Sequence, residues 1–290
     1  MRRFVPFSVL LLLLIASTSA LSQHDHSRCG TPFDRAFREQ EALRGIPGYF
    51  GCNAIERVDV KLQISLHIVQ DRDGMTGVAD DDIIGAQDRL NLLWAPIGMS
   101  FEICRINLIE NYQWDSLMVF TDYNEEAQMI AVHYFPNTIN VYLCDTIVRE
   151  DEGQVGGYAY FPGGPDVIVC DKDEFNFDAV VMPHEMGHFF GLYHTFETDL
   201  GIELADGSNC EVAGDLVCDT EADPDEDGNA DPDIECNYTG PVTQDSNGDW
   251  YVPPVDNIMS YYPADCICRF TPQQYNRMVE QYRTIRFYLW

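Results

Sequence analysis

Basic side chains are scarce in this 290-residue chain, which has 17 lysines and arginines against 48 aspartates and glutamates. The formal net charge of −31 repels nucleic acid and anionic lipid, so we expect neither as a partner. The same charge suits divalent cations, although it also serves plain solubility or adaptation to a salty medium. No internal repeat is visible.

Long apolar runs are rare as well. Met1, Arg2 and Arg3 precede an apolar run at 4–15, and small residues follow at 16–20. This order predicts a secretory signal peptide over 1–20, since the run is short for a transmembrane anchor. No other segment approaches 18 apolar residues. We therefore expect the mature protein to be secreted, to have no membrane anchor and to be monomeric. Ten cysteines then predict several disulfides.

The rest of the chain divides by pattern. Residues 21–57 are polar and mixed, which predicts a pro-segment or N-terminal extension with little core of its own. From residue 58 regular patterns begin, and they predict strands at 58–68, 99–108, 138–147 and 166–170, and helices at 80–95, with an N-cap in Asp80–Asp82, and at 125–134. Residues 200–254 are acidic and show no periodicity. Thr271, Pro272 and Gln274 begin a last helix that runs towards residue 286.

One motif carries chemistry. Residues 184–194 read His-Glu-Met-Gly-His-Phe-Phe-Gly-Leu-Tyr-His. On a helix, His184 and His188 lie one turn apart on the same face and can bind one ion. Gly191 can end the helix so that His194 becomes a third ligand. Three histidines leave one position for water, which is typical of a catalytic zinc site, and Glu185 lies beside the first ligand.

Pro183 stands directly before the first of these histidines. A proline inside a helix loses a hydrogen bond and clashes with the preceding turn. If the helix were capped by Asp178, the proline would lie beyond the first turn. The helix therefore either starts late or is kinked at this point.

The motif His-Glu-x-x-His-x-x-Gly-x-x-His is the metzincin signature. The segments Asn257-Ile-Met-Ser-Tyr261, Gly214-Asp-Leu-Val-Cys-Asp-Thr220 and Phe270-Thr-Pro-Gln-Gln-Tyr-Asn-Arg-Met278 match further. Over residues 58–286 the chain resembles the pappalysin family of zinc metalloproteases. The resemblance implies an α/β (α+β) catalytic domain over 58–290 with two subdomains: a twisted five-stranded mixed sheet that ends in the active-site helix, and an irregular C-terminal subdomain with a Met-turn and a C-terminal helix.

The resemblance also implies roles for single residues. Met259 would form the Met-turn, and the Tyr261 phenol would donate to the developing oxyanion, although an aromatic that simply packs the turn is the alternative. Two disulfides are implied by analogy, Cys210 with Cys236 and Cys218 with Cys266. Cys268 is an extra cysteine that the family pattern lacks.

Structural calcium is a further implication of the resemblance. Asp215, Asp219 and Thr220 lie at the matching segment and offer the oxygen ligands that calcium needs. No complete EF-hand spacing is present, and an acidic run is often only a solvated face.

Cys29, in the presumed pro-segment, resembles the inhibitory cysteine of the family. Its thiolate would occupy the open zinc position and keep the precursor latent. The alternative is an ordinary disulfide, for example to Cys52.

Together these features predict a secreted zinc endopeptidase. A zinc-activated water attacks the peptide bond, and Glu185 acts as general base. Residues 156–162 are expected to form an edge strand that holds an extended protein or peptide substrate as an antiparallel strand. Two other functions remain open: a non-catalytic binding protein with a relic zinc site, and a zinc hydrolase of non-peptide amides or esters.

Overall fold

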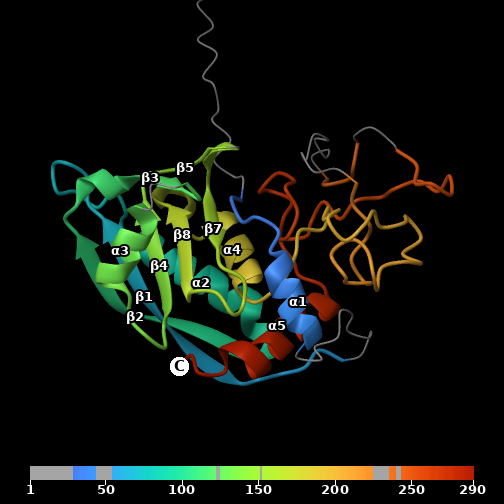
Figure 1. Ribbon diagram of the computed structural model, residues 1–290, viewed down its shortest axis with the longest axis horizontal. Coiled ribbons are helices and arrows are strands. Elements are labelled where there is room, and N and C mark those ends of the chain that lie inside the picture. Colours follow the sequence, from blue (N-terminus) through green and yellow to red (C-terminus); the bar gives the residue numbers. More distant parts are fainter. Residues whose placement is uncertain (1–28, 44–53, 122–124, 151, 225–234, 240–242) are drawn as a thin grey trace, which may run out of the picture.

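A five-stranded sheet organises the larger half of the molecule (Figure 1). The computed structural model describes residues 29–43, 54–121, 125–150, 152–224, 235–239 and 243–290. The strands are β1 (Val60–Val69), β2 (Met99–Ile109), β4 (Ile139–Cys144), β7 (Gly157–Ala159) and β8 (Val167–Asp171), in the order β2-β1-β4-β8-β7. Four strands are parallel, and β7 runs antiparallel to β8 at the edge. The expected five-stranded mixed sheet is confirmed.

A second, smaller sheet was not expected. It contains β3 (Ser116–Val119), β5 (Thr146–Arg149) and β6 (Gly153–Val155), in the order β3-β5-β6. The single strand expected at 138–147 is in fact two, because the chain leaves the large sheet at Asp145. The Asp145 amide donates to the Asp115 carbonyl at 3.0 Å and so turns the chain towards the second sheet.

Five α-helices are described: α1 (Arg35–Leu43), α2 (Asp80–Trp94), α3 (Glu125–His133), α4 (Val181–Phe189) and α5 (Pro272–Gln281). Short 3₁₀ turns occupy Ala95–Ile97, Tyr112–Asp115 and Lys172–Glu174, and a π-helical turn, Tyr282–Arg286, follows α5. The N-cap of α2 is Ala79, not one of the three aspartates. The aspartates form the first turn, where their charges complement the positive end of the helix.

Alternate residues of the strands face two separate cores, as the period of two requires. Ile168 and Cys170 of β8 belong to the core that contains α2, α4 and α5. Val167 and Val169 belong to the other core, which α3 and the small sheet cover. The active-site helix therefore lies on one face of the sheet, next to the edge strand β7.

Pro183 lies in the first turn of its helix. Helix α4 begins at Val181, and the first bond of the helix runs from the His184 amide to the Val180 carbonyl. A proline in the first turn sacrifices no intrahelical bond. The helix therefore starts late, which was one of the two expected solutions.

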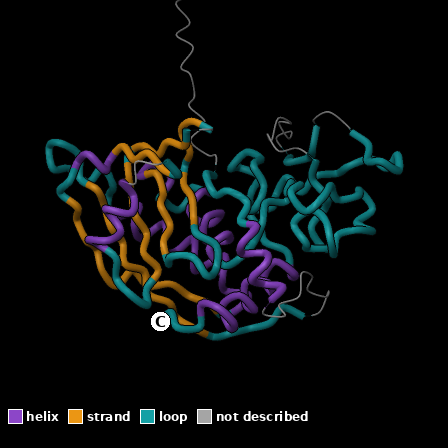
Figure 2. Tube along the Cα trace, in the orientation of Figure 1, coloured by secondary structure: helices purple, strands orange, loops and turns teal. Residues whose placement is uncertain are grey.

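Residues 197–270 form the irregular half. Within the described part of this range the chain is entirely loop and turn (Figure 2). Helix α5 follows it and begins as expected: the Thr271 hydroxyl accepts from the Gln274 amide, and the Gln274 side chain accepts from the Thr271 amide. The expected irregular subdomain and C-terminal helix are confirmed.

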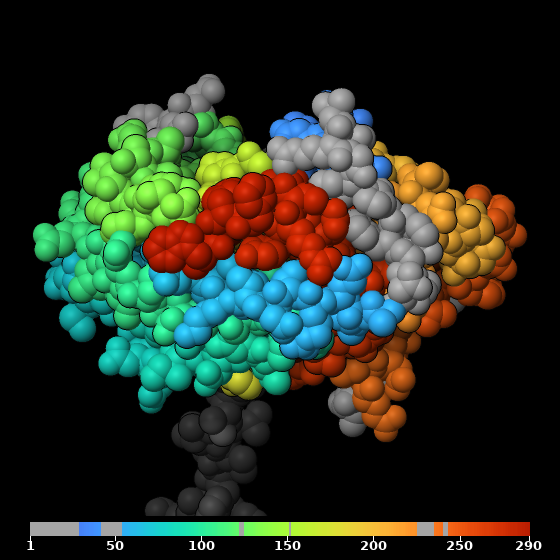
Figure 3. Space-filling view, turned by 90° about the horizontal axis from the view of Figure 1, so that it is seen from below, coloured from blue at the N-terminus to red at the C-terminus, as the bar shows by residue number. Residues whose placement is uncertain are grey.

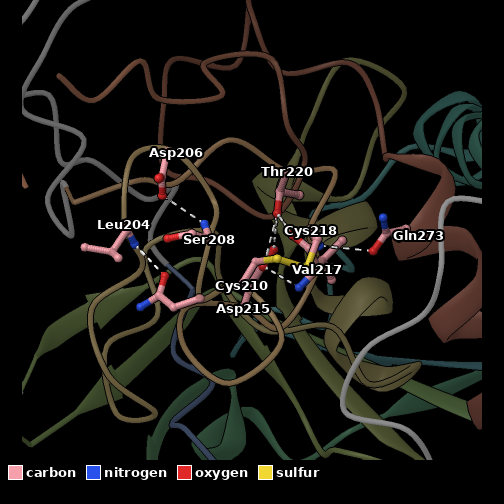
Figure 4. The surroundings of a disulfide bond; sticks show 10 residues. Leu204, Asp206, Ser208, Cys210, Asp215, Val217, Cys218, Thr220 and Gln273 are labelled. Atoms are coloured by element: carbon pink, nitrogen blue, oxygen red, sulfur yellow. Dashed lines mark hydrogen bonds between the residues drawn. A yellow bond between two sulfur atoms is a disulfide. The ribbon is translucent and has the colours of Figure 1, made fainter. Parts of the chain in front are cut away.

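Both expected disulfide pairings are wrong. Cys210 is bonded to Cys218, with Cα atoms 5.1 Å apart (Figure 4), and Cys236 is bonded to Cys266, with Cα atoms 5.5 Å apart. The chain between Cys210 and Cys218 reverses at Gly214, which has a φ of 64°, and the reversal brings these two cysteines within bonding distance. The pairs Cys210–Cys236 and Cys218–Cys266 are then excluded. Cys268 is a free, exposed thiol.

The C-terminal segment closes the sheet half. Seen from below, this segment lies along the residues that begin β1 (Figure 3). The Gln63 amide donates to the Trp290 carbonyl at 3.0 Å, and Arg283 pairs with Glu56. Among the described residues, none of the helices is both long and apolar enough to cross a membrane. The expected signal peptide over 1–20 lies outside the described residues.

Candidate active site

Three histidines from α4 and the turn after it converge on one point. The Nε2 atom of His188 lies 3.1 Å from Nε2 of His184 and 3.0 Å from Nε2 of His194. Helix α4 supplies the first two. Gly191 turns the chain with a φ of 87°, and a Cβ atom there would come within 2.7 Å of the Gln281 side chain. Only glycine fits this turn, which brings His194 back to the helix.

The tautomers of two histidines follow from their hydrogen bonds. His184 Nδ1 lies 2.6 Å from the Ile258 carbonyl and His188 Nδ1 lies 2.7 Å from the Leu192 carbonyl. A carbonyl only accepts, so each Nδ1 carries the proton and donates it. Each Nε2 then presents a lone pair. Two lone pairs at 3.1 Å form no hydrogen bond, and this arrangement calls for a cation between them.

The protonation states agree with a metal site. Burial lowers the pKa of His184 to about 4. Burial, reinforced by the neighbouring imidazoles, holds the pKa values of His188 and His194 well below the usual range. All three rings are therefore neutral and able to bind a metal. Tetrahedral zinc with bonds of about 2.0–2.1 Å needs its nitrogen ligands roughly 3.3 Å apart, so the donor set fits zinc.

Met259 lies against the active-site helix. Its side chain is fully buried, and a Cβ atom at Gly187 would overlap its sulfur. The Met259 carbonyl accepts from the Thr195 amide at 3.1 Å, directly after the third histidine. The structure thus places Met259 where a Met-turn supports the ligands. Gly187 was not singled out from the sequence, although its small size is what allows this contact.

Glu185 lies in the site with one oxygen free. Its Oε2 accepts from the Thr31 hydroxyl at 2.8 Å, whereas its buried Oε1 has no hydrogen-bond partner among the described residues. Burial raises the pKa of Glu185 to about 7. A carboxyl group that exchanges its proton near neutral pH suits general acid–base chemistry.

Cys29 and Tyr261 complete the cluster. Cys29 Sγ and the three histidine nitrogens all lie within 4.8 Å of one another. The Tyr261 hydroxyl donates to the Cys29 carbonyl at 3.0 Å and lies 3.3 Å from His194 Nε2. The phenol therefore points into the site and does more than pack the turn. Cys29 is a free thiol, which excludes the expected alternative of a disulfide; Cys52 lies outside the described residues.

Residues 29–31 lie along the edge strand. Cys29 forms a parallel bridge with Gly157, and the Gly30 amide donates to the Gly157 carbonyl at 2.5 Å. The Ala159 amide donates to the Thr31 hydroxyl at 2.8 Å. Arg149, which the sequence did not single out, donates to the Gly30 carbonyl at 3.0 Å. A cavity of about 300 Å³ opens beside this segment and is lined by Phe33, Glu152, Glu197 and Tyr261, among others.

The expected calcium residues lie apart from this site. Asp215 is buried and accepts from the Thr220 hydroxyl and the Val217 amide (Figure 4), whereas Asp219 accepts from the Gln273 amide. Glu203, which no motif indicated, is buried near Asp215, and neither of its carboxyl oxygens has a partner among the described residues. Burial raises the pKa values of Glu203 and Asp215 to about 8. Two buried carboxyl groups, of which Glu203 has both oxygens without a partner among the described residues, fit a divalent cation.

The chain is similar to known metalloproteases in sequence. The peptidase M43 model, described as pregnancy-associated plasma protein-A, matches residues 124–283. An extracellular metalloprotease of Arthroderma benhamiae is 25% identical over 97% of this chain and 98% of its own length. One from Pyricularia oryzae is 26% identical over 96% of each chain.

Solved structures share the fold. A mutant of Tannerella forsythia promirolysin superimposes with a TM-score of 0.57 at 17% identity, covering 90% of this chain and 96% of that one. Mature mirolysin in complex with a cleaved peptide gives a TM-score of 0.55 at 18% identity, over 80% and 96%. The family match covers more than half of the chain. The chain therefore belongs to the pappalysin family, peptidase M43, and is a metallopeptidase.

Proposed function

We propose that this protein is a secreted zinc endopeptidase made as a latent precursor. The observation that carries the proposal is the convergence of three neutral imidazoles, with facing Nε2 lone pairs, beside the buried carboxyl group of Glu185. A structural zinc site is closed by four protein ligands and needs no general base such as Glu185. The names of the fungal relatives, which are extracellular metalloproteases, support secretion.

The three histidines would hold the zinc, and a bound zinc supplies a Lewis acid and lowers the pKa of a water to about 7. Glu185 would take the proton from that water once the Cys29 and Thr31 side chains that now lie against its carboxyl group have left, and would pass it to the leaving amine. The Tyr261 hydroxyl already donates to a backbone carbonyl in the cleft. In the active protein the scissile carbonyl would take this place, and the same hydrogen bond would stabilise the oxyanion.

The edge strand β7 would hold the substrate. One side of β7 pairs with β8, and the other side now binds residues 29–31 through backbone and side-chain hydrogen bonds. An extended peptide can bind the same side of β7 as an added antiparallel strand, in the direction opposite to residues 29–31, which bridge β7 in parallel. A site that recognises extended backbone on both sides of the scissile bond favours an endopeptidase.

Latency would come from residues 29–31, which block two functions at once. The Cys29 thiol lies within 4.8 Å of the histidine nitrogens, where it would take the fourth position on the metal. The Thr31 hydroxyl occupies the Glu185 oxygen. Because these residues also cover β7, substrate cannot enter until the segment leaves.

Calcium in the irregular half is a second part of the proposal. Asp215 and Glu203 are two buried acids at close range, and a divalent cation would relieve the cost of ionising both. The spare oxygens of Glu203 support this more directly than the acidic composition does.

The decisive experiment compares the processed wild type with Glu185→Gln on a peptide library, a denatured protein and simple amide and ester substrates. We expect the wild type to cleave peptides, and Glu185→Gln to lower the cleavage rate about 100- to 10,000-fold. The zinc content of the two proteins should be equal. Zinc in both proteins and cleavage by neither would favour a binding protein. Turnover of esters but not of peptides would favour the non-peptide hydrolase.

A further inference from the structure

Helix α1 packs against the catalytic domain beside the histidine cluster: the Phe161 ring, which contacts α1, lies 5.4 Å from the His188 ring, centroid to centroid. Asp34 begins the helix by accepting from the Phe37 amide at 2.9 Å. The Phe37 side chain is 1% exposed and joins an apolar cluster with Phe161, Tyr193, Leu216 and Ile285. Its ring stacks on Phe161 with centroids 5.0 Å apart. Helix α1, which lies between α4 and the irregular half in Figure 1, is thus anchored by the Phe37 side chain.

A carboxylate on the same helix face provides a second anchor. Glu41 lies one turn after Phe37, so both side chains point to the same side. Glu41 is fully buried and accepts from Arg277 Nη2 at 2.9 and 3.0 Å and from Gln281 Nε2 at 2.5 Å. Both donors belong to α5, at the other end of the sequence.

Arg277 connects this anchor to the active-site turn. Its Nε donates to the Gly191 carbonyl at 2.6 Å, and its guanidinium lies over the Tyr193 ring, 4.9 Å from the centroid. The Arg277 side chain is fully buried and pairs with the Glu41 carboxylate. Removing one member of a buried ion pair is costly, so the surface favours a ligand that brings the Glu41 carboxylate to this point.

We propose that this surface, formed by Phe161, Tyr193, Leu216 and Ile285 around Arg277 and here called the helix site, recognises an amphipathic helix with Phe and Glu four residues apart. In the precursor α1 fills it, and holds the segment in place independently of the Cys29 thiol. After processing, the released segment binds the same site and inhibits in trans. This inference rests on the proposed function, because it assumes that the segment is removed from an active protease.

The geometry explains why one anchor does not replace the other. Cys29 and Thr31 contact the histidines, Glu185 and β7, whereas Phe37 and Glu41 contact Phe161, the turn after α4 and α5. Loss of the thiol removes the contact with the metal site but leaves the apolar cluster and the buried ion pair intact. A precursor without the thiol therefore keeps α1 docked.

The test is hydrogen exchange of the amides of α1 in full-length precursors that all carry Glu185→Ala to prevent self-cleavage. We expect Cys29→Ala to leave the protection of α1 unchanged. Glu41→Gln should speed exchange at least tenfold and Phe37→Ala about 100-fold. Glu39→Gln, the same chemical change at an exposed position of the helix, is the matched control.

Two results would overturn the proposal: unprotected α1 amides in the Cys29→Ala precursor, or equal exchange in Glu41→Gln and Glu39→Gln. The changes that are compared lie in the segment, so the catalytic domain, with its shared Glu185→Ala change, is chemically identical in every case. This readout needs no catalysis, and an inactive protein would disprove the proposed function while leaving the helix site to be judged by exchange.

Trans inhibition is measured on processed wild type with a synthetic peptide of residues 29–43 carrying Cys29→Ala. We expect inhibition that Glu41→Gln weakens at least tenfold and that Glu39→Gln leaves unchanged. Equal inhibition by all three peptides would show that the Arg277 pairing does not select the segment.

Discussion

The two halves of the molecule are stabilised in different ways. The sheet half buries strands and helices on both faces of a continuous sheet, and the disulfides of the described residues lie outside it. The irregular half lacks helices and strands within its described part, and contains two disulfides and the buried carboxyl pair of Glu203 and Asp215. In the first half, helices and strands provide hydrogen-bond partners for the backbone amide and carbonyl groups. In the second, two disulfides constrain an irregular chain whose buried apolar side chains, such as Ile258 and Phe270, join the core of the sheet half.

The largest effect is expected in the sheet core. Leu66 on β1 is fully buried, so Leu66→Ala should lower the free energy of unfolding by about 4 kcal/mol through lost burial and a cavity. Urea unfolding measures this, with and without reductant and chelator. A Leu66→Ala effect that grew when the disulfides were reduced would show that the two halves do not have separate sources of stability.

Removing the longer disulfide should cost nearly as much. Cys236 and Cys266 are 30 residues apart, and loop entropy predicts a loss of about 3.5 kcal/mol for the double serine variant. The Cys210–Cys218 bond, with a separation of 8, should cost about 2.5 kcal/mol. Limited proteolysis should cut the irregular half first. Preferential cutting of the sheet half would contradict the comparison.

Chelation should destabilise the irregular half. If calcium is held at a concentration 100 times its Kd, its removal costs about 2.7 kcal/mol and lowers the Tm. Glu203→Gln should reduce the response to calcium, because it removes a carboxylate from the buried pair. Asp206→Asn changes an exposed aspartate of the same region and serves as the control. A Tm insensitive to both chelator and added calcium would eliminate the calcium site.

Acid should act on the sheet half through His67. This buried ring on β1 lies 3.1 Å from the Asn140 side chain, and burial lowers its pKa to about 4. The unfolded ring titrates near 6.5. The neutral ring therefore contributes stability that is fully present above pH 6.5 and is lost as the pH falls towards 4, about 2 kcal/mol at pH 5. The His67→Gln variant should lose this part of the acid sensitivity; an unchanged pH profile of unfolding would refute the assignment.

The smallest effect is expected at a helix end. Asp82 accepts from the Ala79 amide at 3.3 Å and lies in the first turn of α2. Asp82→Ala should cost about 0.5–1 kcal/mol through the lost cap and the helix dipole. Asp88→Ala, in the middle of the same helix, is the control for loss of charge. Equal losses in the two variants would show that capping plays no part.

Local patterns predicted much of this protein because their residues are close in sequence. The spacing of His184 and His188, the turn at Gly191 and the cap at Thr271 each depend on a few neighbouring residues, and helical geometry converts that spacing directly into position. Strand β1 follows equally from the alternation of its apolar and polar residues. Asp145 is the exception, because the break there depends on a contact with Asp115.

Other features depend on contacts between distant segments, and only the tertiary structure decided them. The cysteine pairs could not be derived by counting, and the family analogy predicted the wrong partners. Glu203, Arg149 and Glu41 belong to no motif, and Arg149 and Glu41 acquire their roles only from residues far away in the sequence. Spacing along the chain therefore specified the histidines of the metal site. Folding brought the segment that covers them, and the helix site that holds it, to their places, because burial and pairing of charges across such distances leave no periodic trace in the sequence.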